Sequence, residues 1–171
     1  MLELKVFDGE RDVVLRFEHS LLSLSKWEAK TRKAFLARSQ RTPSELYSYF
    51  ECMLLPPEDD PNLVVLINPE QMKELTDYIN TSQTASSVPV DDKKVLDDET
   101  ITSELIYWWL AALRIPFQPT ESWHLSRTVM LVQIGGYKSQ PEDKRKKRAK
   151  PNMADWTRIN EERKKRYGTN G

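Results

Sequence analysis

The chain has 171 residues, 30% of them charged and 39% apolar, which is enough for one domain with a modest core. Its formal net charge is zero, but residues 138–171 hold 12 Lys/Arg and 5 Asp/Glu, so a basic tail follows an acidic body. Cys52 is the single cysteine, which excludes an internal disulfide, and the first residues have no leader pattern. We therefore expect a protein of a reducing cytoplasm.

The N-terminal residues predict a β-hairpin. Residues 2–7 (LELKVF) alternate between apolar and polar types, residues 13–17 (VVLRF) are rich in strand formers, and Asp8-Gly9 between them is a turn signal. An isolated hairpin is only marginally stable in water, so we expect residues 1–20 to pack on the rest of the chain. Next, Ser23 or Ser25 can begin a short helix that carries Trp27, which we interpret as a core residue.

Two capping boxes predict two further helices. Residues 42–45 (TPSE) and 68–71 (NPEQ) each place proline at the first helical position and Glu or Gln at the third. Pro56-Pro57 should end the first of these helices. Between them, residues 63–67 (LVVLI) have the composition of a strand, although a loop lying on the core also fits. Residues 80–99 are rich in Ser, Thr and Asp, and we expect them to form a mobile linker.

The most apolar stretch, residues 100–136, predicts an αα-hairpin at the centre of the core. Thr102 or Ser103 caps its first helix, and Pro116 ends that helix. The helix is apolar almost all round, so we expect it to be buried on more than one side. Thr120 should begin the second helix, and Gly135-Gly136 should stop it. The unbroken apolar run is about half the ~20 residues that a bilayer needs, so we predict no membrane span.

The C-terminal residues are strongly polar. Residues 137–151 predict a solvated linker, and residues 153–166 could form a charged helix with favourable i,i+4 pairs. Six of the seven residues 144–150 (KRKKRAK) are basic, which suits binding to phosphates, docking on an acidic protein or a solubilising tail. No aromatic residues are interleaved for base stacking, which weighs against nucleic acid. The basic residues proposed for partner binding are Lys144, Arg145, Lys146, Lys147 and Arg148.

Catalytic patterns are scarce. His19 and His124 lie on different predicted elements, and neither has a Cys or His neighbour at metal-ligand spacing. Cys52 lies inside an amphipathic helix, where it fits a small buried hydrophobic residue. Glycine-rich phosphate loops and calcium-loop spacing are both missing from the sequence. We therefore predict no enzyme activity, metal or cofactor.

Three segments, in this order along the chain, carry a resemblance to a known group of proteins. The group consists of small proteins encoded in the tail modules of tailed bacteriophages and described as tail assembly chaperones. The segments are SLSKWE (23–28), TSELIYWW (102–109) with IPF (115–117) and WHL (123–125), and NEERKKR (160–166) with GT (168–169).

The resemblance implies a non-enzymatic chaperone that binds the tape measure protein in the host cytoplasm and helps recruit tail tube protein. Such chaperones then leave the growing tail and are absent from the finished virion. By the same analogy, the chaperone could form a ring or a dimer around a long helix. Tyr107, Trp108 and Trp123, if not wholly buried, would offer a groove for an amphipathic helix, whereas a packed core is the alternative for each.

The sequence thus predicts a mostly α-helical α+β fold, with an N-terminal β-hairpin, a helical body over residues 21–137 and a flexible basic tail over residues 138–171. Two other functions stay open. The chain could be a structural tail or head–tail joining component of the virion, or a nucleic-acid-binding accessory protein that uses the basic tail.

Overall fold

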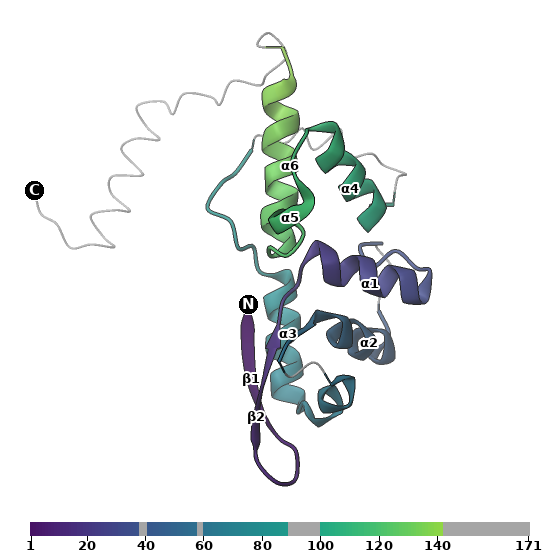
Figure 1. Ribbon diagram of the computed structural model, residues 1–171, viewed down its shortest axis with the longest axis vertical. Helices are drawn as coiled ribbons and strands as arrows, with labels where there is room; N and C mark the ends of the chain where they lie inside the picture. The colour runs from purple at the N-terminus through teal and green to yellow at the C-terminus, as the bar shows by residue number, and fades with distance from the viewer. Residues whose placement is uncertain (38–40, 58–59, 89–99, 142–171) are drawn as a thin grey trace, which may run out of the picture. The chain divides into compact units, whose positions relative to one another are not determined.

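The computed structural model describes residues 1–37, 41–57, 60–88 and 100–141 of the chain. The chain divides into two units, Met1–Ser139 and Gln140–Gly171, and all the elements below belong to the first (Figure 1). The basic run 144–150 and the charged helix predicted for residues 153–166 lie outside the described residues. A small antiparallel sheet followed by helices confirms the predicted α+β, mostly helical fold class. In chain order the elements are β1 (Leu2–Phe7), β2 (Asp12–Phe17), α1 (Leu21–Thr31), α2 (Pro43–Met53), β3 (Leu54–Leu55), the 3-10 helix η1 (Pro61–Leu66), α3 (Pro69–Asn80), α4 (Ser103–Ala112), α5 (Phe117–Thr120) and α6 (Leu125–Ser139).

Strands β1 and β2 form the predicted hairpin, in which Leu4 lies opposite Leu15. Asp8 closes the turn, because its Oδ1 accepts hydrogen bonds from the backbone N–H groups of Glu10 and Arg11. Buried side chains alternate along both strands, so one face of the hairpin packs on the core.

The two-residue strand β3 extends the sheet in the order β1-β2-β3, and no sequence pattern predicted it. It pairs Leu54 with Phe17 and Leu55 with Arg16. Helix α2 therefore ends at Met53, earlier than Pro56-Pro57 suggested, because the chain turns to the extended conformation needed for this pairing.

Helix α1 is capped by Ser20 and not, as predicted, by Ser23 or Ser25. Ser23 instead takes the third helical position, where its Oγ accepts from the Ser20 N–H at 2.8 Å and its own N–H donates to Ser20 Oγ. Trp27, on the buried face of this helix, has no exposed surface, which confirms it as a core residue. Its ring meets the ring of Phe35 edge to face at 5.2 Å.

Both predicted capping boxes are present. The carboxylate of Glu45 accepts from the Thr42 N–H, and Gln71 Oε1 accepts from the Asn68 N–H, while Thr42 and Asn68 cap α2 and α3 in return. Residues 63–67 belong mainly to η1, so the strand alternative is wrong. Pro61 at the start of η1 and the Asp60 cap favour a helical turn there.

The C-terminal helices differ from prediction in how they are joined. Thr102 caps α4, as one of the two predicted candidates. The second helix of the pair, α6, begins at Leu125 and not at Thr120, because α5 occupies the connection. Thr120 is buried at the end of α5, where its carbonyl accepts from Thr128 Oγ1 at 2.9 Å. Gly135-Gly136 does not stop α6, which continues to Ser139.

One hydrophobic core joins the sheet to helices α1, α2, α3, α4 and α6. The backbone N–H of Leu125 donates to the His19 carbonyl at 2.6 Å, which ties the start of α6 to the residues before α1. The larger fully buried side chains are Trp27, Tyr49, Phe17, Phe50, Leu15, Leu21, Leu24, Met53, Leu75, Ile106, Leu110 and Val64.

Candidate functional site

Helix α4 buries one side and exposes the other. Ile106 and Leu110, one turn apart, are fully buried, whereas Trp108 points away from them and is 64% exposed. We expected this helix to be buried on more than one side, and that expectation is wrong, because the side that carries Trp108 is exposed. A tryptophan with this much exposed surface contributes little to the core and is available for contact with another molecule.

Tyr107 lies between the core and the exposed surface. Its hydroxyl donates to a carboxylate oxygen of Glu121 at 2.9 Å, and its ring meets the ring of Phe117 edge to face at 5.1 Å. Burial and the neighbouring Glu121 carboxylate raise the pKa of Tyr107, so its phenol stays protonated. Phe117 is 44% exposed and extends the apolar surface beyond Tyr107.

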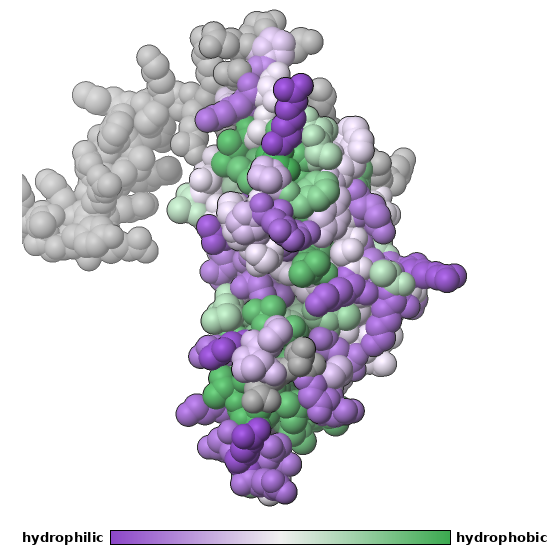
Figure 2. All heavy atoms as spheres, viewed as in Figure 1, coloured by the Kyte–Doolittle hydropathy of each residue, from purple (hydrophilic) through white to green (hydrophobic). Residues whose placement is uncertain are grey.

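The third predicted aromatic residue, Trp123, lies in a different setting. It is half-buried just before α6, and the Arg127 guanidinium lies over its ring at 5.0 Å from the ring centroid. Both line a groove of about 380 Å³ between α6 and residues 83–86, which belong to no helix or strand. Figure 2 shows hydrophobic side chains among hydrophilic ones on the visible face over α6. The groove is lined by Gln83, Thr84, Ala85, Ser86, Trp123, Arg127, Met130, Leu131 and Ile134.

The structure thus gives the three aromatic residues three different settings: Tyr107 contacts Phe117, Trp123 contacts Arg127, and Trp108 is exposed on α4. The basic residues Lys144, Arg145, Lys146, Lys147 and Arg148 lie outside the described ranges. Phe117 and Arg127 were not predicted as site residues. The signals that could have indicated them are the position of Phe117 directly after the helix-ending Pro116 and the i,i+4 spacing of Trp123 and Arg127.

The two histidines, which the sequence placed on different elements, lie side by side in the structure. Their ring centroids are 5.2 Å apart, and Ser20 and His124 form an antiparallel backbone bridge. His19 Nδ1 lies 2.6 Å from the Tyr49 hydroxyl oxygen, and His124 Nδ1 lies 2.8 Å from Ser126 Oγ. The sequence could not show this pairing, because it depends on how α6 packs against the residues before α1.

Burial governs the chemistry of both rings. Burial, together with the nearby His124, lowers the pKa of His19 to about 3, and burial lowers that of His124 against the opposing effect of the Tyr78 carbonyl. The two side chains are only 4% and 5% exposed. A substrate cannot reach either ring without opening the fold, so the pair is suited to joining elements. Within the described residues, no group of three or more His, Cys, Asp or Glu side chains is arranged to hold a metal ion.

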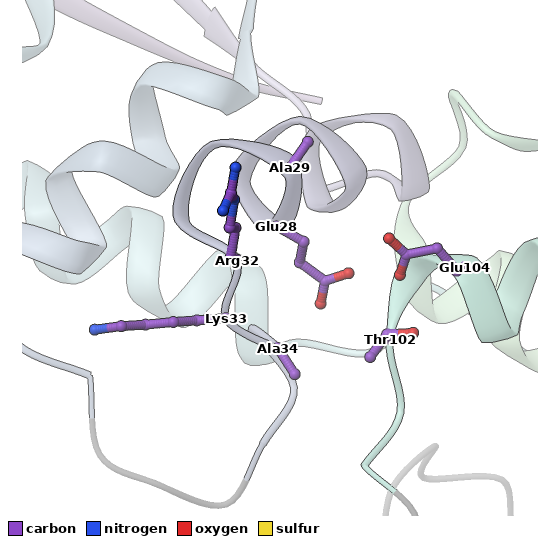
Figure 3. A pocket seen from close by; sticks show the side chains of 7 residues that line it. All are labelled: Glu28, Ala29, Arg32, Lys33, Ala34, Thr102 and Glu104. Atoms are coloured by element: carbon purple, nitrogen blue, oxygen red, sulfur yellow. The ribbon is translucent and has the colours of Figure 1, made fainter.

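A second cavity, of about 330 Å³, lies between the end of α1 and the start of α4 (Figure 3). The buried Glu28 carboxylate accepts from the backbone N–H of Phe35 at 3.0 Å and from the N–H and Oγ of Ser103 at 2.7 and 2.6 Å. In Figure 3 the Lys33 side chain extends away from Glu28, and it pairs with Glu45 at 2.7 Å. Glu28 therefore joins α1 to the first turn of α4, and these hydrogen bonds explain why a carboxylate is buried here.

Cys52 in α2 packs against the core, as its sequence context predicted, but it is half-buried and not fully buried. Burial raises the pKa of its thiol, which disfavours the nucleophilic thiolate.

No protein-family model, curated protein or solved structure matches this chain. Among the helices of the described ranges, none is both long enough and apolar enough to cross a membrane.

Proposed function

We propose that this chain is a non-enzymatic tail assembly chaperone of a tailed bacteriophage, which binds the tape measure protein. One observation carries the protein-binding part of the proposal: the α4–α6 region exposes Trp108 and Phe117 and adds a groove beside Trp123. Exposed apolar surface of this kind is typical of protein interaction sites. The identity of the partner comes from the resemblance of the sequence to phage tail assembly chaperones.

A chaperone of this class needs apolar surface that stays available while its partner is being made. A tape measure protein is a long helical chain whose apolar faces aggregate before the tail tube encloses them. Covering one such face with an aromatic surface would keep it soluble, and recruited tail tube subunits would then displace the chaperone. The proposal places the protein in the host cytoplasm and outside the mature virion.

The groups that the sequence offered for catalysis support a non-enzymatic role. Both histidines are buried and hydrogen bonded, and burial raises the pKa of the Cys52 thiol. A protein that acts by covering a partner's apolar surface needs none of these groups to react.

Co-expression with the tape measure protein tests the proposal. We expect the native chain to increase the soluble fraction of the tape measure protein, and the double variant Trp108→Ala/Phe117→Ala to lose most of this effect. Val65→Ala is the matched control, because Val65 is 75% exposed but lies in η1, away from this surface. Equal solubility with and without the chain would contradict the proposal.

Mass spectrometry of purified virions separates the chaperone from a structural component. The proposal expects this chain to be absent from the particle. Its presence at fixed stoichiometry would assign it to the tail or to the head–tail joint instead.

A further inference from the structure

The two sides of α6 have different surroundings. Leu125 and Thr128 are buried, and Val129 and Val132 pack against the hydrophobic core. The opposite side carries the apolar residues that line the groove. On the helix these residues are Met130, Leu131 and Ile134, with Arg127 beside them, and Trp123 lies just before the helix. Counted from Trp123, the five positions follow the helical spacing i, i+4, i+7, i+8 and i+11.

The second wall of the groove is segment 83–86, held to α6 by a hydrogen bond from the Gln83 N–H to Ser126 Oγ at 2.9 Å. Its side chains are small or uncharged, so the groove has an apolar floor on α6 and a polar rim. A floor and rim of this kind match the apolar and polar sides of an amphipathic helix.

The two segments that form the groove carry positive charge only. Residues 81–88 carry no charge, and residues 122–139 carry Arg127 and Lys138 but no Asp or Glu. The acidic residue just before them, Glu121, accepts a hydrogen bond from the Tyr107 hydroxyl. Arg127 is the only charged residue that lines the groove among the described residues, and its guanidinium is positioned over Trp123. The body of the chain before residue 138 is otherwise acidic, with 14 Lys/Arg and 21 Asp/Glu. A partner carboxylate is therefore favoured at this groove and disfavoured over much of the remaining surface.

We propose that the groove between segment 83–86 and α6 binds an amphipathic helix of a partner protein that carries acidic residues beside its apolar face. The apolar side chains of the partner lie against Met130, Leu131 and Ile134, and one partner carboxylate pairs with Arg127. This inference deepens the proposed function and rests on it for the source of the helix. To the proposed function it adds the surface of this chain that binds the partner, and the negative charge of the partner segment that this surface recognises.

A pair of synthetic peptides of about 18 residues tests the charge preference on the full chain. Both have leucine along one helical face; one has glutamate flanking that face and its twin has lysine at the same positions. Fluorescence anisotropy of labelled peptides should show the glutamate peptide binding about tenfold more tightly than its twin at low salt. The difference should shrink at about 1 M salt, where charges more than about 3 Å apart are screened.

Arg127→Glu should reverse this preference, so that the lysine peptide becomes the tighter ligand. Lys73→Glu makes the same change in net charge at an exposed position of α3 and should leave the preference unchanged. Ile134→Asp should weaken both peptides, because it places a charge on the apolar floor. Circular dichroism spectra that match the native chain show that each variant is folded.

Equal affinity for the two peptides, or a loss of preference that is the same in Arg127→Glu and Lys73→Glu, would overturn the proposal. Concentration-dependent self-association that Ile134→Asp abolishes, with no peptide binding, would assign the groove to a second copy of the chain and also overturn it. Failure of the tape measure test with an intact charge reversal would remove the chaperone proposal and keep the groove's specificity. Suppose instead that the chain solubilises the tape measure protein, that Arg127→Glu leaves this effect unchanged, and that Arg127→Glu does not reverse the peptide preference. The groove proposal would then be overturned, and the chaperone proposal would stand.

Discussion

Gly135 of α6 lies directly against the side chain of Leu113 at the end of α4. A Cβ atom at Gly135 would lie 2.8 Å from Leu113 Cδ1, closer than side-chain atoms pack. At the next position, a Cβ on Gly136 would meet no atom within 4 Å. The first glycine thus permits the close approach of α4 and α6, whereas the second lies in open space.

These neighbouring glycines give a matched pair of substitutions. Gly136→Ala should raise the free energy of unfolding by about 0.5–1 kcal/mol, because alanine restricts the unfolded chain and favours the helix. Gly135→Ala should give no gain or a loss, because Leu113 must shift to admit the methyl group. Urea denaturation measures both values, and equal stabilisation by the two substitutions would contradict the close contact.

The glycine pair also shows where sequence reasoning fails. Consecutive glycines near the end of an apolar run are typical of helix termination, but here the contact with Leu113, which is distant in sequence, determines the use of Gly135. Thr120 is a similar case, because its position suited a helix cap while its carbonyl binds Thr128 in the interior. Both errors come from local patterns that tertiary packing overrides.

The correct predictions rest on signals contained within a few residues. The two capping boxes, at residues 42–45 and 68–71, and the alternating residues 2–7 specify their elements locally. The candidate site was only partly predictable. An apolar run such as residues 105–110 cannot say which of its aromatic residues faces solvent, and the contact of His19 with His124 requires the complete fold.

The Glu28 carboxylate should be important for stability. Glu28→Ala would leave the buried N–H groups of Phe35 and Ser103 without their acceptor, at a cost of about 2–4 kcal/mol. Glu28→Gln keeps one acceptor oxygen and should cost less. Glu104→Ala, at an exposed position in the first turn of α4, is the control and should cost about 0.5 kcal/mol. Urea denaturation of the three variants should give this order, and a Glu28→Ala effect no larger than that of Glu104→Ala would refute the role.

The buried histidine pair should make stability depend on pH. The pKa of His19 is about 3 in the folded chain, below the value of about 6.5 expected when unfolded, so folding favours the neutral ring. Stability from this group is present above pH 6.5 and is lost as the pH falls from there toward 3. The loss should reach about 2 kcal/mol at pH 5.

Substitution separates this effect from the titration of carboxylates. In His19→Asn, the difference in unfolding free energy between pH 7 and pH 5 should be about 2 kcal/mol smaller than in the native chain. The other titratable or charged groups near the pair are Tyr49, Tyr78, Glu18, Arg127 and the N-terminal amine, and they are common to both proteins. Urea midpoints at several pH values provide the measurement, and parallel pH profiles would show that His19 protonates freely in the fold.

The two sides of α4 should respond to truncation in opposite ways. Ile106→Ala removes a fully buried side chain and should lower the free energy of unfolding by about 2–4 kcal/mol, because it leaves a cavity. Trp108→Ala removes a larger side chain that is 64% exposed, and it should change stability by less than about 1 kcal/mol. Thermal and urea denaturation test this difference independently of any partner. If Trp108→Ala destabilised the chain as much as Ile106→Ala, Trp108 would belong to the core, and the protein-binding surface proposed on α4 would lose its largest aromatic side chain.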